Sequence, residues 1–134
     1  MPRKSDSNDP SAWIWLAESD LEGVRLLTER NLSYPLCRSK LAEIVEKVLK
    51  AELLRMDWFL EKTHDLEKLA GELQARGSDL VSSARPLSIQ LADAYFSERY
   101  PGFDWDDPDW PGLQDTLNQV SLLLQKVKSR LAIS

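Results

Sequence analysis

The sequence has 134 residues, with 17 Lys and Arg against 22 Asp and Glu and a formal net charge of -5. Its length is that of one compact domain, and its acidity excludes non-specific duplex DNA binding, because counterion release requires a basic surface. A single cysteine excludes an intramolecular disulfide, and one Cys with one His is too few for a multi-cysteine zinc site. The net negative charge does not exclude a local strip of basic residues that binds a nucleotide or a single nucleic-acid strand.

Residues 1–8 are polar and are expected to form a flexible tail, so the single domain spans residues 9–134. No apolar run follows the basic residues at the start, which argues against a signal peptide. No uncharged apolar run approaches the length of a membrane span. We therefore expect a cytoplasmic protein that does not enter a membrane.

Helical periodicity predicts the first helices in chain order. One begins with Asp9 as N-cap and Pro10 at its first position and ends before residues 31–35, where Asn, Ser and Pro interrupt the pattern. The next spans about 35–59, with expected i,i+4 pairs Glu43–Lys47 and Glu46–Lys50 on an exposed face. A shorter helix covers 63–77, with Thr63 or His64 at its cap and Gly77 as its stop.

Two further helices complete the predicted fold. The segment 78–102 contains Pro86, so a break or kink is expected there and a firm helix from about 86 to 100. Residues 101–112 are rich in Pro, Gly and Asp and are expected to be loop, and residues 113–131 carry an apolar seam typical of a bundle helix. Because no strand alternation persists, the sequence predicts an all-α bundle of four long helices and one short helix.

No standard catalytic or metal motif is present. There is no phosphate loop, HExxH, CxxC or GxSxG pattern, so no catalytic residue, cofactor or metal ligand is assigned. The acidic run at 104–109 does not have the spacing of a 12-residue calcium loop and contains Pro108. A solvated connector anchored by Trp105 and Trp110 explains it better than a divalent-cation site.

Several short motifs, in this order, resemble the HEPN domain family over about residues 10–131. They are Trp13 with Asp20 and Leu21; Glu46, Lys47 and Lys50; Lys62, Thr63, His64, Asp65 and Leu66; and Tyr95, Arg99, Tyr100 and Pro101. The resemblance implies an up-and-down bundle that forms a homodimer. It also implies a non-catalytic nucleotide- or substrate-binding protein beside a nucleotidyltransferase partner, in a toxin–antitoxin-type pair.

The family also contains RNA-cleaving toxins, whose motif is an Arg followed four to six residues later by a His. No histidine follows Arg99 in this chain, which disfavours that activity because His is the natural proton carrier near neutral pH. A protein-interaction module without any ligand is a further alternative.

Each candidate nucleotide-binding residue also has an ordinary structural explanation. His64 caps a helix or, with Lys62, contacts a phosphate at that helix's N-terminus. Lys47 and Lys50 pair with glutamates on the surface or point into a phosphate groove. Arg99 and Tyr100 stabilise a helix end and anchor a loop, or bind a phosphate and stack on a base.

Five tryptophans are many for this length, and two of them constrain the surface. Trp13 and Trp15 cannot lie on the same face of a helix, so one is expected to face solvent or a partner. Aromatic residues are enriched in interface cores, which supports the expectation of a homodimer.

Overall fold

The computed structural model describes residues 7–94 and 107–131, and every regular element within them is a helix. The helices are α1 (Pro10–Glu29), α2 (Tyr34–Arg55), α3 (Leu66–Ala75), α4 (Val81–Leu91) and α6 (Trp110–Arg130). This confirms the predicted all-α bundle. None of the helices in the described ranges is long and apolar enough to cross a membrane.

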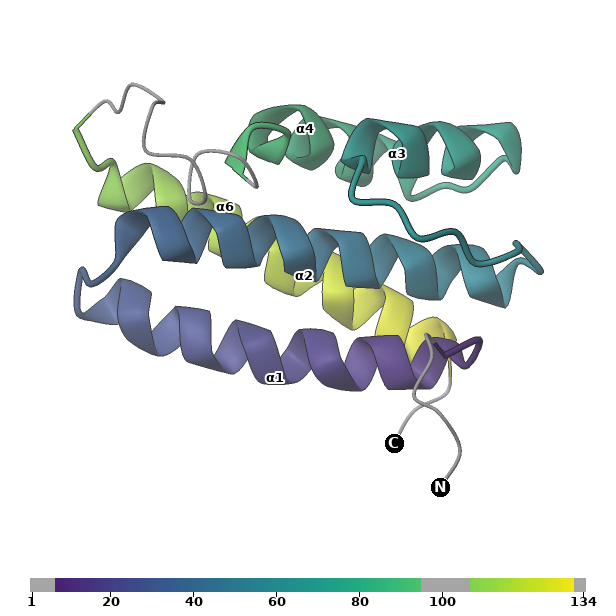
Figure 1. Cartoon of the computed structure of the whole chain (residues 1–134), viewed down its shortest axis with the longest axis horizontal. Coiled ribbons are helices and arrows are strands. Elements are labelled where there is room, and N and C mark those ends of the chain that lie inside the picture. Colours follow the sequence, from purple (N-terminus) through teal and green to yellow (C-terminus); the bar gives the residue numbers. More distant parts are fainter. Residues whose placement is uncertain (1–6, 95–106, 132–134) are drawn as a thin grey trace.

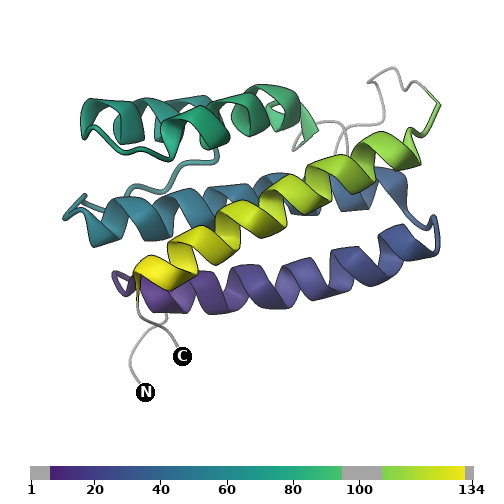
Figure 2. The ribbon, with the colours of Figure 1, turned by 180° about the vertical axis from the view of Figure 1, so that it is seen from behind.

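The helices form layers around α2 (Figures 1 and 2). α1 lies antiparallel beside α2 along one edge, and the shorter helices α3 and α4 lie on the opposite side of α2. α6 crosses diagonally behind and contacts α1, α2 and α4. Figure 2 shows the end of α6 near the start of α1, and Lys128 of the last turn of α6 donates to Glu18, near the middle of α1, at 2.9 Å.

Apolar side chains from all five helices fill the space between the layers. α2 supplies the largest share, and its buried residues point toward both neighbouring layers. Trp13 is 8% exposed and Trp15 is 69% exposed, which confirms that the two tryptophans lie on different faces of α1. Trp110 packs edge-on against Tyr34, with ring centroids 5.2 Å apart, and so anchors the start of α6 to that of α2.

Local signals account for most helix ends. Asp9 caps α1 by accepting from the Ser11 N–H at 3.0 Å, and Pro10 occupies the first turn, as predicted. Three helices, α1, α2 and α3, are followed two residues after their last helical residue by a residue with positive φ, namely Asn31 (52°), Asp57 (64°) and Gly77 (69°). At each of them the following N–H groups bond back to the last turn, which satisfies carbonyls that would otherwise lack a partner.

Several predicted boundaries were wrong. α2 ends at Arg55, not near residue 59. α4 begins at Val81 and continues through Pro86, so the helix does not start at the proline. The predicted continuation over 95–100 lies outside the described residues.

The start of α6 also differs from the prediction. The helix begins at Trp110 because Asp109 caps it, accepting from the Gly112 N–H at 3.0 Å. Pro111 fits the first turn, where a missing N–H is tolerated. Residues 110–112, expected in the loop, therefore form the first turn of the helix.

Candidate functional site

His64 lies in the connection between α2 and α3, and its ring is held by a glutamate of α2. Its Nδ1 lies 2.7 Å from Glu46 Oε1. The His64 side chain is 61% exposed, whereas that of Glu46 is 10% exposed. An ionised carboxylate can only accept, so Nδ1 carries the proton in this contact, and the orientation of the ring is fixed.

The other oxygen of Glu46 is held from the interior. Lys50 Nζ donates to Glu46 Oε2 at 3.0 Å, and the Lys50 side chain is only 3% exposed. The same ammonium lies 5.1 Å from the centre of the Trp13 ring, within range of a cation–π contact. A continuous chain of contacts therefore runs from Trp13 in the core through Lys50 and Glu46 to His64 at the surface.

His64 is not the cap of α3, which corrects the prediction. Asp65 is the N-cap, and its Oδ1 accepts from the N–H groups of Glu67 and Lys68, both at 3.1 Å. Thr63 Oγ1 in turn accepts from the Asp65 N–H. Because Asp65 already occupies these donors, an anion bound nearby has to rely on side chains and not on the helix N-terminus.

A cavity of about 570 Å³ opens beside this histidine. Among the described residues, it is lined by positions 62–67 and by Ala92 at the end of α4. Lys62 is exposed and makes no ion pair with any residue in the described ranges. The cavity thus brings together a carboxylate-oriented imidazole and an ammonium group that has no ion-pair partner among the described residues.

The two candidate lysines of α2 are engaged elsewhere. Lys47 donates a hydrogen bond to Asp20 of α1 and does not pair with Glu43, which corrects the predicted pair. Glu43 forms an ion pair with Lys40, with 2.8 Å between Nζ and Oε2. The pair Glu46–Lys50 does form, but it is buried and not on an exposed face. Neither Lys47 nor Lys50 lines the cavity beside His64.

Arg99 and Tyr100 lie outside the described residues, as do Tyr95, Pro101 and Trp105 of the sequence motifs. Within residues 7–94 and 107–131, no three Asp, Glu, His or Cys side chains are grouped so as to hold a metal ion. Burial raises the pKa of the Cys37 thiol above its ordinary value, so this cysteine is a poor nucleophile at neutral pH.

Sequence reasoning missed the role of Glu46 as the residue that orients His64. The signal was present, because α2 carries buried side chains on nearly all its faces. A charged residue on such a helix is forced into the interior and needs a partner. The identity of that partner depends on how the α2–α3 connection returns along α2, which local spacing does not reveal.

The profile of the HEPN domain family matches residues 10–129, most of the chain. Neither characterised proteins nor solved structures give a significant match to this chain.

Proposed function

Because the chain belongs to the HEPN domain family, we propose that it binds a phosphate-bearing nucleotide in the cavity beside His64. The observation that carries the proposal is the exposed imidazole of His64, held by the buried carboxylate of Glu46. Beside it lies the ammonium of Lys62, which has no ion-pair partner in the part of the chain that the structure describes. In this role the protein is a binding subunit and not a catalyst.

The chemistry of the cavity suits such a ligand. Lys62 supplies a positive charge for phosphate, and a histidine whose orientation is fixed supplies a directed polar contact. A volume of about 570 Å³ falls in the range of about 300–1,000 Å³ usual for small-molecule sites. The proposed site also includes Arg99 and Tyr100. In this role the Arg99 guanidinium binds a phosphate through two hydrogen bonds, and the Tyr100 ring stacks on the base.

The proposal includes a nucleotidyltransferase as partner, in a toxin–antitoxin-type pair, and a homodimer of this chain. These elements rest on the family resemblance. Purification of the tagged protein from its own host tests the pairing: a stoichiometric nucleotidyltransferase supports it, and its absence contradicts it.

Nucleotide binding is testable by calorimetry with the four ribonucleoside triphosphates. We expect at least one of them to bind, and Lys62→Ala to weaken that binding about tenfold, the effect of losing one charged hydrogen bond. The matched control is Lys126→Ala, which removes a half-exposed lysine of α6 outside the cavity lining and should leave affinity unchanged. Absence of binding for all four nucleotides, or equal losses in both variants, contradicts the proposal.

RNA cleavage is the second candidate function, and the His64–Glu46 contact is the observation that favours it. A carboxylate-oriented imidazole is a suitable general base, here for the proton of an attacking ribose 2′-hydroxyl. This activity predicts that the purified protein cuts RNA in the presence of a chelator and that His64→Gln does not. Intact RNA after incubation with the unmodified protein eliminates it.

A further inference from the structure

Glu46 and Lys50 together determine which nitrogen of the neutral His64 ring carries the proton. Lys50 Nζ donates to Glu46 Oε2 at 3.0 Å, and an ammonium group has no lone pair with which to accept. The carboxylate that it holds can only accept at its other oxygen, which lies 2.7 Å from His64 Nδ1. In the neutral ring the proton is therefore on Nδ1, and Nε2 carries a lone pair.

This lone pair decides what Nε2 can bind. It cannot form a hydrogen bond with a phosphate oxygen, because both atoms are acceptors. In the imidazolium form both nitrogens donate, so that Nδ1 keeps its bond to Glu46 while Nε2 donates to a ligand. The exposed His64 ring lines the same cavity as Lys62, so a phosphate held by Lys62 comes next to the ring. A contact between that phosphate and Nε2 therefore requires a second proton on the ring.

We propose that nucleotide binding beside His64 takes up one proton, with Glu46 as the positioning residue that makes Nε2 a donor to phosphate only in the imidazolium form. The inference rests on the proposed nucleotide site and states the form of the ring in which that site binds. Histidine side chains gain and lose a proton between about pH 5 and 8. The cavity should accordingly bind phosphate more tightly in mildly acidic than in mildly alkaline solution.

The charged groups around the His64 ring include more carboxylates than available ammonium groups. Within the described ranges they are Glu46 and Lys50 from α2, Lys62 from the α2–α3 connection, and Asp65 and Glu67 at the start of α3. α4 contributes only the uncharged Ala92 to the cavity lining that the structure describes. A bound phosphate adds negative charge beside the ring and so stabilises the imidazolium form in the complex, which couples proton uptake to binding.

One conservative substitution reverses the hydrogen-bonding roles of the two ring nitrogens. In Glu46→Gln the side-chain oxygen has to accept from Lys50, which can only donate, and the amide nitrogen is left to face His64. Nδ1 then accepts from that amide, and the neutral ring carries its proton on Nε2. This variant should bind phosphate without taking up a proton. Removal of a merely structural residue would instead weaken binding and leave its dependence on pH unchanged.

Nuclear magnetic resonance of the His64 ring tests the proposal directly. His64 is the only histidine of the chain, so a protein without a histidine tag, grown with isotope-labelled histidine, gives ring signals from this residue alone. At about pH 8 we expect a neutral ring protonated on Nδ1 in the nucleotide-free protein. Saturation with any of the four ribonucleoside triphosphates that binds should convert it to the imidazolium. In Glu46→Gln the ring should stay neutral, with its proton on Nε2, in both states.

Calorimetry at several pH values gives a second measurement. Between about pH 7 and 8.5 phosphate esters keep their charge, because their last proton leaves near pH 6, whereas imidazole loses its second proton. The affinity of the unmodified protein should therefore fall by up to about tenfold per pH unit, and that of Glu46→Gln should stay nearly constant.

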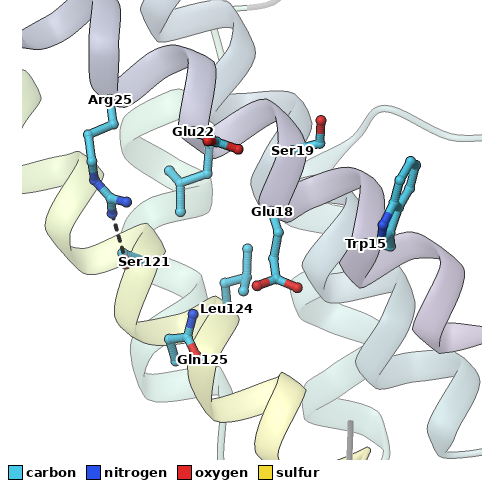
Figure 3. A pocket seen from close by; sticks show the side chains of 9 residues that line it. Trp15, Glu18, Ser19, Glu22, Arg25, Ser121, Leu124 and Gln125 are labelled. Atoms are coloured by element: carbon cyan, nitrogen blue, oxygen red, sulfur yellow. Dashed lines mark hydrogen bonds between the residues drawn. The ribbon is translucent and has the colours of Figure 1, made fainter. Parts of the chain in front are cut away.

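The matched control is Arg25→Ala, which removes an exposed guanidinium far from this chemistry. Figure 3 shows Arg25 in a groove of about 550 Å³ between α1 and α6, where it donates to Ser121 at 3.3 Å. Arg25 does not line the cavity beside His64. This variant should keep both the affinity and the pH dependence of the unmodified protein.

The outcomes separate this inference from the proposed function. A nucleotide that binds while the ring stays neutral overturns the inference and leaves the nucleotide site in place. A neutral ring protonated on Nε2 in the nucleotide-free protein, or the same pH dependence with and without Glu46→Gln, also overturns it. If no triphosphate binds at any pH, the proposed function and the inference fail together. Should Glu46→Gln not fold, the ring signals of the unmodified protein decide alone.

Discussion

Glu46 joins the interior of the bundle to the candidate site. It lies on α2, with one oxygen bonded to buried Lys50 and the other to the exposed ring of His64. Buried ion pairs are seldom more stabilising than well-packed apolar residues, because desolvation offsets most of the attraction. The arrangement is better explained by its effect on His64, whose ring it holds in one orientation.

The buried pair predicts strong coupling between two substitutions. Glu46→Leu leaves Lys50 buried without its carboxylate and should lower the free energy of unfolding by about 3 kcal/mol. Adding Lys50→Met removes the uncompensated charge and should restore most of that loss. Urea unfolding of both single variants and of the double variant measures the coupling. If the loss of unfolding free energy in the double variant equals the sum of the losses in the two single variants, then the contributions of Lys50 and Glu46 to stability are independent.

At the level of the helices, glycine has opposite effects at two nearby positions. Gly77 follows the last turn of α3 with φ at 69°, a conformation that costs other residues about 1–2 kcal/mol. Gly71 lies inside α3, and a Cβ placed there meets no atom within 4 Å. The same residue type is therefore required at the helix end and unfavourable in the helix interior.

We expect the same substitution to have opposite signs at these positions. Gly77→Ala should lower the free energy of unfolding by about 1 kcal/mol, because alanine disfavours positive φ. Gly71→Ala should raise it by about 0.5–1 kcal/mol, because glycine has more conformational freedom to lose in a helix. Thermal and urea unfolding measure both. A loss at Gly71 would show that the interior of α3 has no room for the methyl group.

The presence of the helices was predictable from the sequence because the spacing of apolar residues and the capping residues are local features of the chain. Asp9 and Gly77 mark two helix ends correctly for this reason. The start of α6 was missed because Pro and Gly were taken as loop signals, although the cap at Asp109 accommodates both. Pro86 was taken as a boundary, but α4 continues through it, packed on the bundle.

The candidate site was less predictable because its contacts join distant parts of the chain. The sequence identified His64 and Lys62 as candidates, yet it placed His64 at a helix cap. The partners of Lys47 and His64 come from 27 and 18 residues away, respectively. Side chains on α2 have neighbours on the same helix and on the four other helices that α2 contacts, α1, α3, α4 and α6, and only the packed bundle decides between them.

At the scale of the whole molecule, a network of ion pairs fastens α2, the α3–α4 connection and α6 together. Glu52 is completely buried and accepts from Arg55 Nε at 2.7 Å and from Arg130 Nη1 at 2.6 Å. Arg130 Nη2 also donates to both carboxylate oxygens of Asp79, each at 2.6 Å. Arg130 therefore links the end of α6 to a buried group of α2 and to the segment that precedes α4.

This network predicts a pH-dependent contribution to stability from Asp79. Its pKa lies below the ordinary value, chiefly because Arg130 donates to the carboxylate, with a further contribution from the charge of Lys126. A carboxyl whose pKa is lowered by folding stabilises the folded state above its unfolded pKa, and this contribution disappears as the pH falls through the folded pKa.

Asp79→Asn should therefore lower Tm by a few degrees at neutral pH, and the difference should vanish as the pH falls below about 4. Asp115→Asn, which removes an exposed carboxylate of α6 that has no ion pair in the described residues, should show no such pH-dependent difference. A deficit for Asp79→Asn that persists in acid would mean that the side chain stabilises the bundle by a means other than its charge.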